Sequence, residues 1–80
     1  MADDKASWMG KTKNKPKLTL IRVLAFEQDM SIVELAKKSG VSHETIYNYI
    51  NGETRPYAIK LYKIAKALDT TVEEILENSQ

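Results

Sequence analysis

The segment from residue 31 to residue 52 restricts the fold of this chain more than any other feature of its sequence. It contains two short helical patterns joined only by Ser39-Gly40-Val41-Ser42. A link this tight does not let the two helices pack antiparallel, so they must cross steeply. Its glycine can take the left-handed conformation that such a turn requires. We therefore predict a helix-turn-helix over residues 31–51.

Residues typical of helix ends mark the limits of both helices. Ser31 and Glu34 have the spacing of a capping box, in which hydroxyl and carboxylate each bond a backbone N–H of the other residue. Ser42 is placed to cap the second helix, and Asn51-Gly52 is a stop signal at its other end. Both predicted helices are therefore short, about two turns each.

The second of these helices has two chemically different sides. At about 100° per residue, Ile46, Tyr49 and Ile50 share one side, which we expect to face the core. Polar residues occupy the other side or the exposed first turn: His43, Glu44, Tyr47, Asn48 and Asn51. Imidazole, amide and phenol groups can hydrogen-bond base edges, and a carboxylate can accept from cytosine N4. This side has the chemistry to distinguish base pairs.

Three further helical patterns flank the pair. Apolar residues recur at helical spacing over residues 18–29, where Val23 and Phe26 are expected to widen the apolar side. A second stripe runs over residues 56–68, whose proline suits the first turn of a helix, and residues 71–74 form another capping box before a last short helix. The sequence therefore predicts an all-α fold of five helices.

Composition limits the classes of protein to which the chain can belong. Eighty residues, 42% hydrophobic and with only three Gly and two Pro, indicate one globular domain. There is no Cys, and His43 is the only histidine, so we expect neither a disulfide nor a metal or other cofactor. Signal-peptide and membrane-spanning patterns are absent, so a cytoplasmic location is expected. The sequence offers no acid, base and nucleophile that would converge on a pocket, so we expect neither an enzyme nor a small-molecule substrate.

A net charge of +1 conceals a gradient along the chain. Residues 1–17 carry a net +3, residues 18–68 a net +2 and residues 69–80 a net −4. The first segment has no apolar period, so we predict a flexible basic arm over residues 1–17 and a folded domain over residues 18–80. The lysines that could contact a polyanion from this arm are Lys11, Lys13, Lys15 and Lys17.

Several residues and short motifs occur over residues 18–76 in an order that is typical of one protein family. They are Leu35-Ala36, Gly40-Val41-Ser42, Ile46, Asn51-Gly52, Arg55-Pro56, Ile64-Ala65, Ala67-Leu68 and Val72 to Leu76. The pattern resembles the lambda-repressor and Cro-like, or Xre, helix-turn-helix family. The resemblance implies a five-helix domain that binds double-stranded DNA. The chain departs from that family in three ways: Ile32 stands where Gln is common, Ala25 and Ile50 replace a frequent Arg–Glu pair, and Glu44 and Glu53 bring negative charge near the DNA backbone.

The resemblance also implies roles for individual residues. The implied base contacts are His43, Glu44, Tyr47 and Asn48. The implied phosphate contacts are Ser31, Ile32, Ser42, Asn51 and Arg55, and the arm lysines are expected to wrap the duplex. Phosphate contacts fix register, whereas base contacts choose the sequence.

The sequence thus favours a sequence-specific transcriptional regulator, expected to be a repressor that occupies operator DNA. One short helix reads few base pairs, so we expect a homodimer on a palindromic operator. Val72, Ile75 and Leu76 are the candidate residues for its surface, and the other interpretation is that they only cap the core of their own chain. The alternative is a protein-interaction module, such as an antitoxin or a partner-binding adaptor. Its support is the modest net charge and the acidic residues Glu44 and Glu53.

Overall fold

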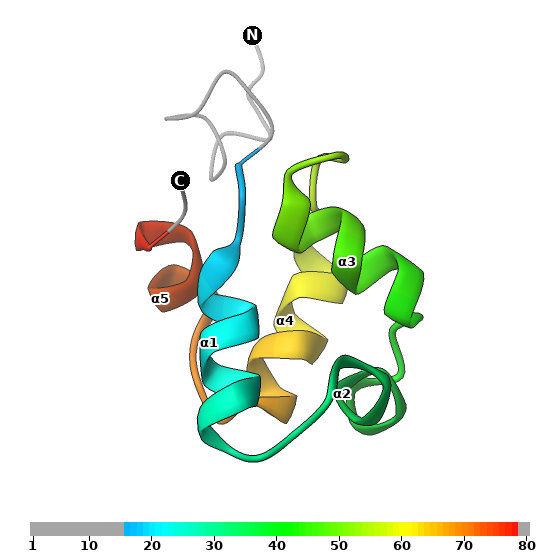
Figure 1. Cartoon of the computed structure of the whole chain (residues 1–80). Coiled ribbons are helices and arrows are strands. Elements are labelled where there is room, and N and C mark those ends of the chain that lie inside the picture. The colour runs from blue at the N-terminus through cyan, green and yellow to red at the C-terminus, as the bar shows by residue number, and fades with distance from the viewer. Residues whose placement is uncertain (1–15, 79–80) are drawn as a thin grey trace, which may run out of the picture.

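The computed structural model describes residues 16–78, and within this range the chain forms five α-helices and no strand (Figure 1). The helices are α1 (Thr19–Glu27), α2 (Ile32–Ser39), α3 (His43–Asn51), α4 (Ala58–Ala67) and α5 (Val72–Glu77). The predicted all-α, five-helix fold is confirmed. None of the described helices combines the length and the apolar character needed to cross a membrane.

α2 and α3 cross each other and pack against α1 and α4. α2 contacts both α3 and α4, while α1 contacts α2, α3 and α5. α5 lies beside α1, on the side away from α3 (Figure 1). This arrangement leaves one side of α3 uncovered.

The core between these helices is built from aliphatic side chains and one tyrosine. Among the described residues, no polar or charged side chain other than that tyrosine is buried. The buried core residues are Leu18, Ile21, Ala25, Leu35, Val41, Ile46, Tyr49, Ile50, Leu61, Ile64, Ala65, Ala67, Leu68 and Ile75, and Pro16 and Pro56 are buried as well. Because Ala25 and Ile50 are both buried and apolar, the departure from the family's charged pair leaves no unpaired charge in the core.

The apolar side of α1 is narrower than its sequence suggests. Ile21 and Ala25 are fully buried, but Phe26 is 81% exposed and Val23 is also exposed. At 100° per residue, Val23 and Phe26 lie between about 140° and 200° from Ile21, on the far side of the helix. The expectation that these two residues extend the buried side is therefore wrong.

Two tight turns bring aspartate into the left-handed conformation that usually favours glycine. Asp29 follows α1 with φ of 56°, and Asp69 follows α4 with φ of 61°. After each aspartate the chain closes with a backbone bond, Met30 N–H to Ala25 at 2.8 Å and Thr70 N–H to Ala65 at 2.9 Å. These bonds satisfy carbonyls that the helix ends leave open.

A single side chain joins the two turns. The Gln28 amide Nε2 donates to the carbonyl of Leu68 at 2.9 Å, across forty residues of sequence. The ends of α1 and α4 are thereby fixed relative to one another. Because α2 and α5 begin shortly after these turns, the same hydrogen bond also restricts where these two helices start.

α4 begins later than the sequence predicts, whereas α5 begins at the predicted cap, Thr71. α4 starts at Ala58, with Tyr57 as its N-cap, so Pro56 precedes the helix instead of occupying its first turn. In α5 the Thr71 hydroxyl accepts the Glu74 N–H at 3.1 Å, as predicted. Ile75 is 0% exposed and belongs to the core of its own chain, so its assignment to a dimer surface is wrong. α5 is short, and its side that faces α1 and α4 uses this residue.

Replacement of the glycine that ends α2 tests the turn. Gly40 has φ of +78°, and a Cβ added to it would meet nothing within 4 Å. Gly40→Ala should therefore lower the free energy of unfolding by about 1 kcal/mol through backbone strain alone, whereas Gly40→Asn should cost less. Urea denaturation measures both. Equal stability of the alanine variant and the wild type would contradict the requirement for a left-handed residue.

Candidate nucleic-acid interface

The start of α3 is fixed by a cap that uses both functions of one hydroxyl. The Ser42 Oγ accepts the Thr45 N–H at 3.2 Å and donates to the Thr45 Oγ1 at 2.9 Å. The hydroxyl predicted to meet a phosphate is thus engaged with Thr45. The backbone N–H groups of His43 and Glu44 come before the first internal bond of the helix and remain available as donors.

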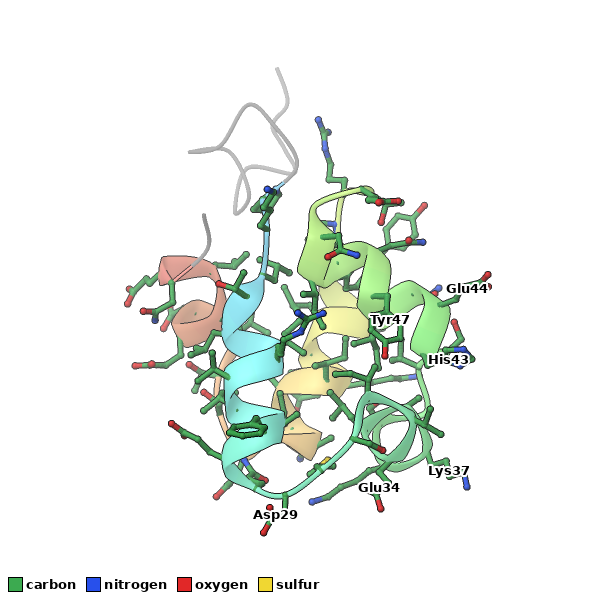
Figure 2. The ribbon with its side chains drawn as sticks, viewed as in Figure 1. Asp29, Glu34, Lys37, His43, Glu44 and Tyr47 are labelled. Atoms are coloured by element: carbon green, nitrogen blue, oxygen red, sulfur yellow. The ribbon has the colours of Figure 1, made fainter. Side chains whose placement is uncertain are left out.

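α3 has the two sides that its sequence predicts. Ile46, Tyr49 and Ile50 are buried against the rest of the domain. On the opposite side His43, Glu44 and Asn51 are exposed, Tyr47 is 39% exposed, and Asn48 is half-buried. Figure 2 shows His43, Glu44 and Tyr47 on the same outer side of the helix. The domain leaves most of this side exposed and covers Asn48 in part.

Two aromatic side chains on this side are held against each other. The rings of His43 and Tyr47 lie one turn apart, with centroids at 6.3 Å and planes at 88°, an edge-to-face arrangement. The pair presents an imidazole and a phenol together near the start of the helix. Both groups can exchange hydrogen bonds with base edges in a major groove.

The N-terminus of α2 also offers backbone N–H donors. The Ser31 Oγ accepts the Glu34 N–H at 3.1 Å, and the Glu34 Oε1 accepts the Ser31 N–H at 2.9 Å. The predicted capping box is therefore confirmed. Because the box occupies Ser31 and Glu34, the N–H groups of Ile32 and Val33 are the ones left open at this helix start within the described residues.

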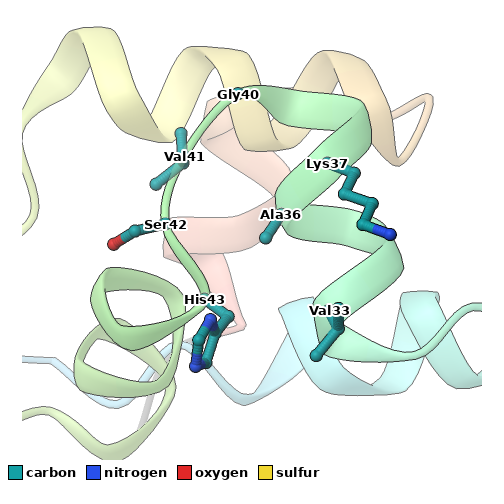
Figure 3. A pocket seen from close by; sticks show the side chains of 7 residues that line it. All are labelled: Val33, Ala36, Lys37, Gly40, Val41, Ser42 and His43. Carbon is teal, nitrogen blue, oxygen red and sulfur yellow. The ribbon is translucent and has the colours of Figure 1, made fainter.

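A shallow groove separates α2 from the start of α3 (Figure 3). Its lining comes from both helices and the turn between them: Val33, Ala36, Lys37, Gly40, Val41, Ser42 and His43. Lys37 and His43 lie on its two walls (Figure 3). The sequence reasoning did not include Lys37 among the site residues. Its spacing of four from Val33, which places both on one side of α2, was the available signal.

The loop after α3 is held at both ends by α3 itself. Gly52 has φ of 72°, and the Glu53 N–H bonds to the Asn48 carbonyl at 2.8 Å, which closes the helix. At the other end the Tyr57 N–H donates to the Tyr49 hydroxyl at 3.1 Å. Arg55 is exposed in the middle of this loop. Its guanidinium therefore extends from a loop with two fixed ends beside α3.

The chain enters the domain next to α3 as well. The Leu18 N–H donates to the Tyr49 carbonyl at 3.1 Å, and Pro16 and Leu18 are buried on either side of exposed Lys17. Packing thus begins at least two residues before the predicted boundary at Leu18. The predicted contacts Lys11, Lys13 and Lys15 lie outside the described residues.

Residues 16–78 contain no group of three or more His, Cys, Asp or Glu side chains placed to hold a metal ion. The exposed charged side chains of this region include Glu44 on α3, Lys37 in the groove lining on α2 and Arg55 in the loop after α3. What this surface offers chemically is hydrogen-bond donors and acceptors on a rigid helix.

Comparison with known proteins places the whole arrangement in a family. A family model described as Helix-turn-helix matches residues 20–75, from the second residue of α1 into α5. The crystal structure of the clp gene regulator ClgR from C. glutamicum is similar in fold, with a TM-score of 0.63. It shares 23% sequence identity, and the match covers 71% of this chain and 74% of that chain. No curated protein matches the chain.

Removal of one hydroxyl tests how the loop beside α3 is held. Tyr49→Phe keeps the buried ring but deletes the acceptor of the Tyr57 N–H. The free energy of unfolding should fall by about 1–2 kcal/mol, because a partly buried donor loses its partner. Hydrogen exchange should speed up at the Tyr57 amide and not at the Leu18 amide, whose acceptor is the backbone carbonyl. Unchanged exchange at Tyr57 would contradict this role.

Proposed function

The chain belongs to the lambda-repressor-like helix-turn-helix family of DNA-binding transcription regulators, and on that premise we propose that it is a sequence-specific repressor. In this proposal it acts in the cytoplasm by occupying operator DNA with α3 in the major groove. A repressor of this kind needs no catalytic group: occupancy alone prevents transcription.

The observation that carries the proposal is the division of α3 into two sides. Its inner side is locked into the core by Ile46 and Ile50, while His43, Glu44 and Tyr47 are uncovered on its outer side. A helix fixed in this way can enter a groove without rearrangement of the domain. Rigid placement matters because base contacts depend on hydrogen-bond geometry.

We assign base contacts to the outer side of α3. The first turn of a recognition helix enters the groove most deeply, so His43 and Glu44 would meet base edges, with Tyr47 and Asn48 one turn further on. An Asn side chain suits adenine, since its amide matches the N6 and N7 positions, and a Glu carboxylate suits cytosine N4. The acidic side chain also penalises contact with phosphates, which favours correct sites over random ones.

Phosphate contacts are assigned to the groups that flank α3. The open N–H groups at the start of α2, at Ile32 and Val33, can bind a phosphate oxygen. Ser31 caps α2 beside these donors, and Ser42 caps α3 beside the open N–H groups of His43 and Glu44. Beyond α3, Asn51 and Arg55 extend from its end and from the fixed loop. These contacts would set the register of the helix on the duplex.

The basic arm would add contacts of its own. Its last residue, Lys17, is held beside the C-terminal half of α3 by the bond from Leu18 to Tyr49. An arm that starts there begins close to the proposed duplex. We assign Lys11, Lys13, Lys15 and Lys17 to the backbone of the DNA, where each neutralised phosphate raises affinity.

Two copies of the chain would be needed for an operator. α3 has nine residues, and only its outer side reaches bases, so one copy reads few base pairs. A twofold homodimer on a palindromic operator, with half-sites about 34 Å apart, doubles the sequence that is read. Val72 and Leu76, both half-buried on α5, remain candidate residues for its surface.

A protein-binding module is the alternative function, favoured by the exposed carboxylate of Glu44 in the first turn of α3. A salt titration separates the two. Affinity for a duplex selected from a random DNA pool should fall steeply with salt, with a log–log slope of roughly −5 or steeper if about six phosphates are contacted. A flat titration, or no enriched duplex at all, would favour the protein-binding module.

Substitutions at two positions, one assigned to a base and one to a phosphate, test these assignments on the selected duplex. Asn48→Ala should cost about 1–3 kcal/mol of binding free energy on that duplex and relax the preference at one base position. Arg55→Ala should weaken binding to selected and random duplexes alike and reduce the salt slope by about one phosphate, whereas Arg55→Lys should keep that phosphate. Competition binding measures all three variants. Equal losses for Asn48→Ala on selected and random DNA would contradict its assignment.

A further inference from the structure

α4 carries an exposed face that none of the proposed DNA contacts uses. Ile59, Tyr62, Lys63 and Lys66 fall within about 100° of one another around the helix. Ile59 is 67% exposed and Tyr62 is 54% exposed. We call these four residues the basic face. An isoleucine exposed to this extent among lysines gains by burial against an apolar partner.

Two of the three lysines of α4 lie over aromatic rings. The Lys66 Nζ lies 5.7 Å from the ring centre of Tyr62, and the Lys60 Nζ lies 5.7 Å from that of exposed Tyr57. Such contacts reduce the freedom of long side chains. α4 contains these lysines together with Lys63, and no acidic residue. The basic face is therefore complementary to a surface that combines apolar groups with carboxylates.

α5 offers that combination. Val72 and Leu76 are half-buried, and Glu73 and Glu77 are exposed next to them, one turn apart. We call these four residues the acidic face. α5 contains no basic residue. Along the helix axis, Val72 and Leu76 are about 6 Å apart, and Ile59 and Tyr62 of the basic face are about 4.5 Å apart. The two apolar pairs therefore have similar lengths.

We propose that the basic face of α4 binds the acidic face of α5 in a second copy of this chain. The inference rests on the dimer of the proposed function and names its surface. In a twofold dimer the contact occurs twice, because each copy supplies one face of each kind. A symmetric pairing of α5 with α5 would instead set Glu73, Glu74 and Glu77 of both copies against one another, which is unfavourable.

Two other occupants fit the basic face less well. The arm carries five lysines among residues 1–17, so like charges would oppose its docking on α4. The DNA backbone would suit the lysines but offers nothing apolar to Ile59 and Tyr62. A second copy satisfies both requirements with residues that the chain already contains.

Charge exchange in the full chain tests the pairing. The variants are K63E/K66E, in which both faces are acidic, E73K/E77K, in which both are basic, and the quadruple variant, in which the signs are exchanged. Sedimentation equilibrium measures self-association of each variant and of an equimolar mixture of the first two. Thermal unfolding checks that every variant folds.

The wild type should form a dimer, and each double variant should associate at least about tenfold more weakly, since attraction becomes repulsion at both contacts. The equimolar mixture and the quadruple variant should regain wild-type association. The proposal is overturned by a wild type that stays monomeric at 1 mM protein (roughly a thousand times a micromolar Kd). Double variants that associate like the wild type, or a mixture that does not recover, overturn it as well.

DNA binding by the single copy is followed separately, on a short random-sequence duplex. The quadruple variant keeps the net charge of the wild type, so its affinity for that duplex should be unchanged. If it neither self-associates nor binds the duplex normally, the basic face contacts DNA and the dimer proposal fails. If wild type and quadruple variant both form dimers but neither binds DNA, the interface is retained and the proposed function is the part that fails.

Discussion

Tyr49 is the residue on which the rest of the structure depends. Its ring is buried between the helices, its backbone carbonyl accepts the Leu18 N–H, and its hydroxyl accepts the Tyr57 N–H, both at 3.1 Å. One residue of α3 thereby fixes where the chain enters α1 and where it enters α4. The helix that presents the outer surface is also the helix to which the neighbouring segments are tied. Movement of α3 relative to the domain would break these bonds together, which makes the surface rigid.

The two sides of α3 have different tasks: the buried side holds the helix in place, and the exposed side carries the groups that can contact a partner. The inner side contributes Ile46 and Ile50 to a core in which, among described residues, the only polar group is the hydroxyl of Tyr49. The outer side is then free to carry groups chosen for recognition, such as the paired rings of His43 and Tyr47. Stability and specificity thus reside on opposite sides of one short helix. Substitutions on the outer side can change the preferred partner with little cost to folding.

Much of the fold could be predicted from local sequence, because caps act locally. The hydroxyls of Ser31 and Ser42 bond where their spacing indicated, and α2 and α3 begin there. Periodicity was less informative about the width of a buried face: Phe26 is exposed because only one narrow side of α1 meets the core. Ile75 was misassigned for the converse reason, since a lone apolar pattern does not say whether its own chain covers it. The bond from the Tyr57 N–H to the Tyr49 hydroxyl and the bond from the Gln28 amide to the Leu68 carbonyl depend on tertiary contacts that no spacing reveals.

The central claim is that the outer side of α3 meets DNA while its inner side stays in the core. Backbone amide spectra of the labelled chain, recorded during titration with the selected duplex, test it most directly. The account predicts the largest shifts over residues 43–51 and at the open amides of Ile32 and Val33, with hydrogen-exchange protection of Ile50 unchanged. A duplex that binds while the amides of residues 43–51 do not shift, or that releases Ile50 from protection, would contradict it.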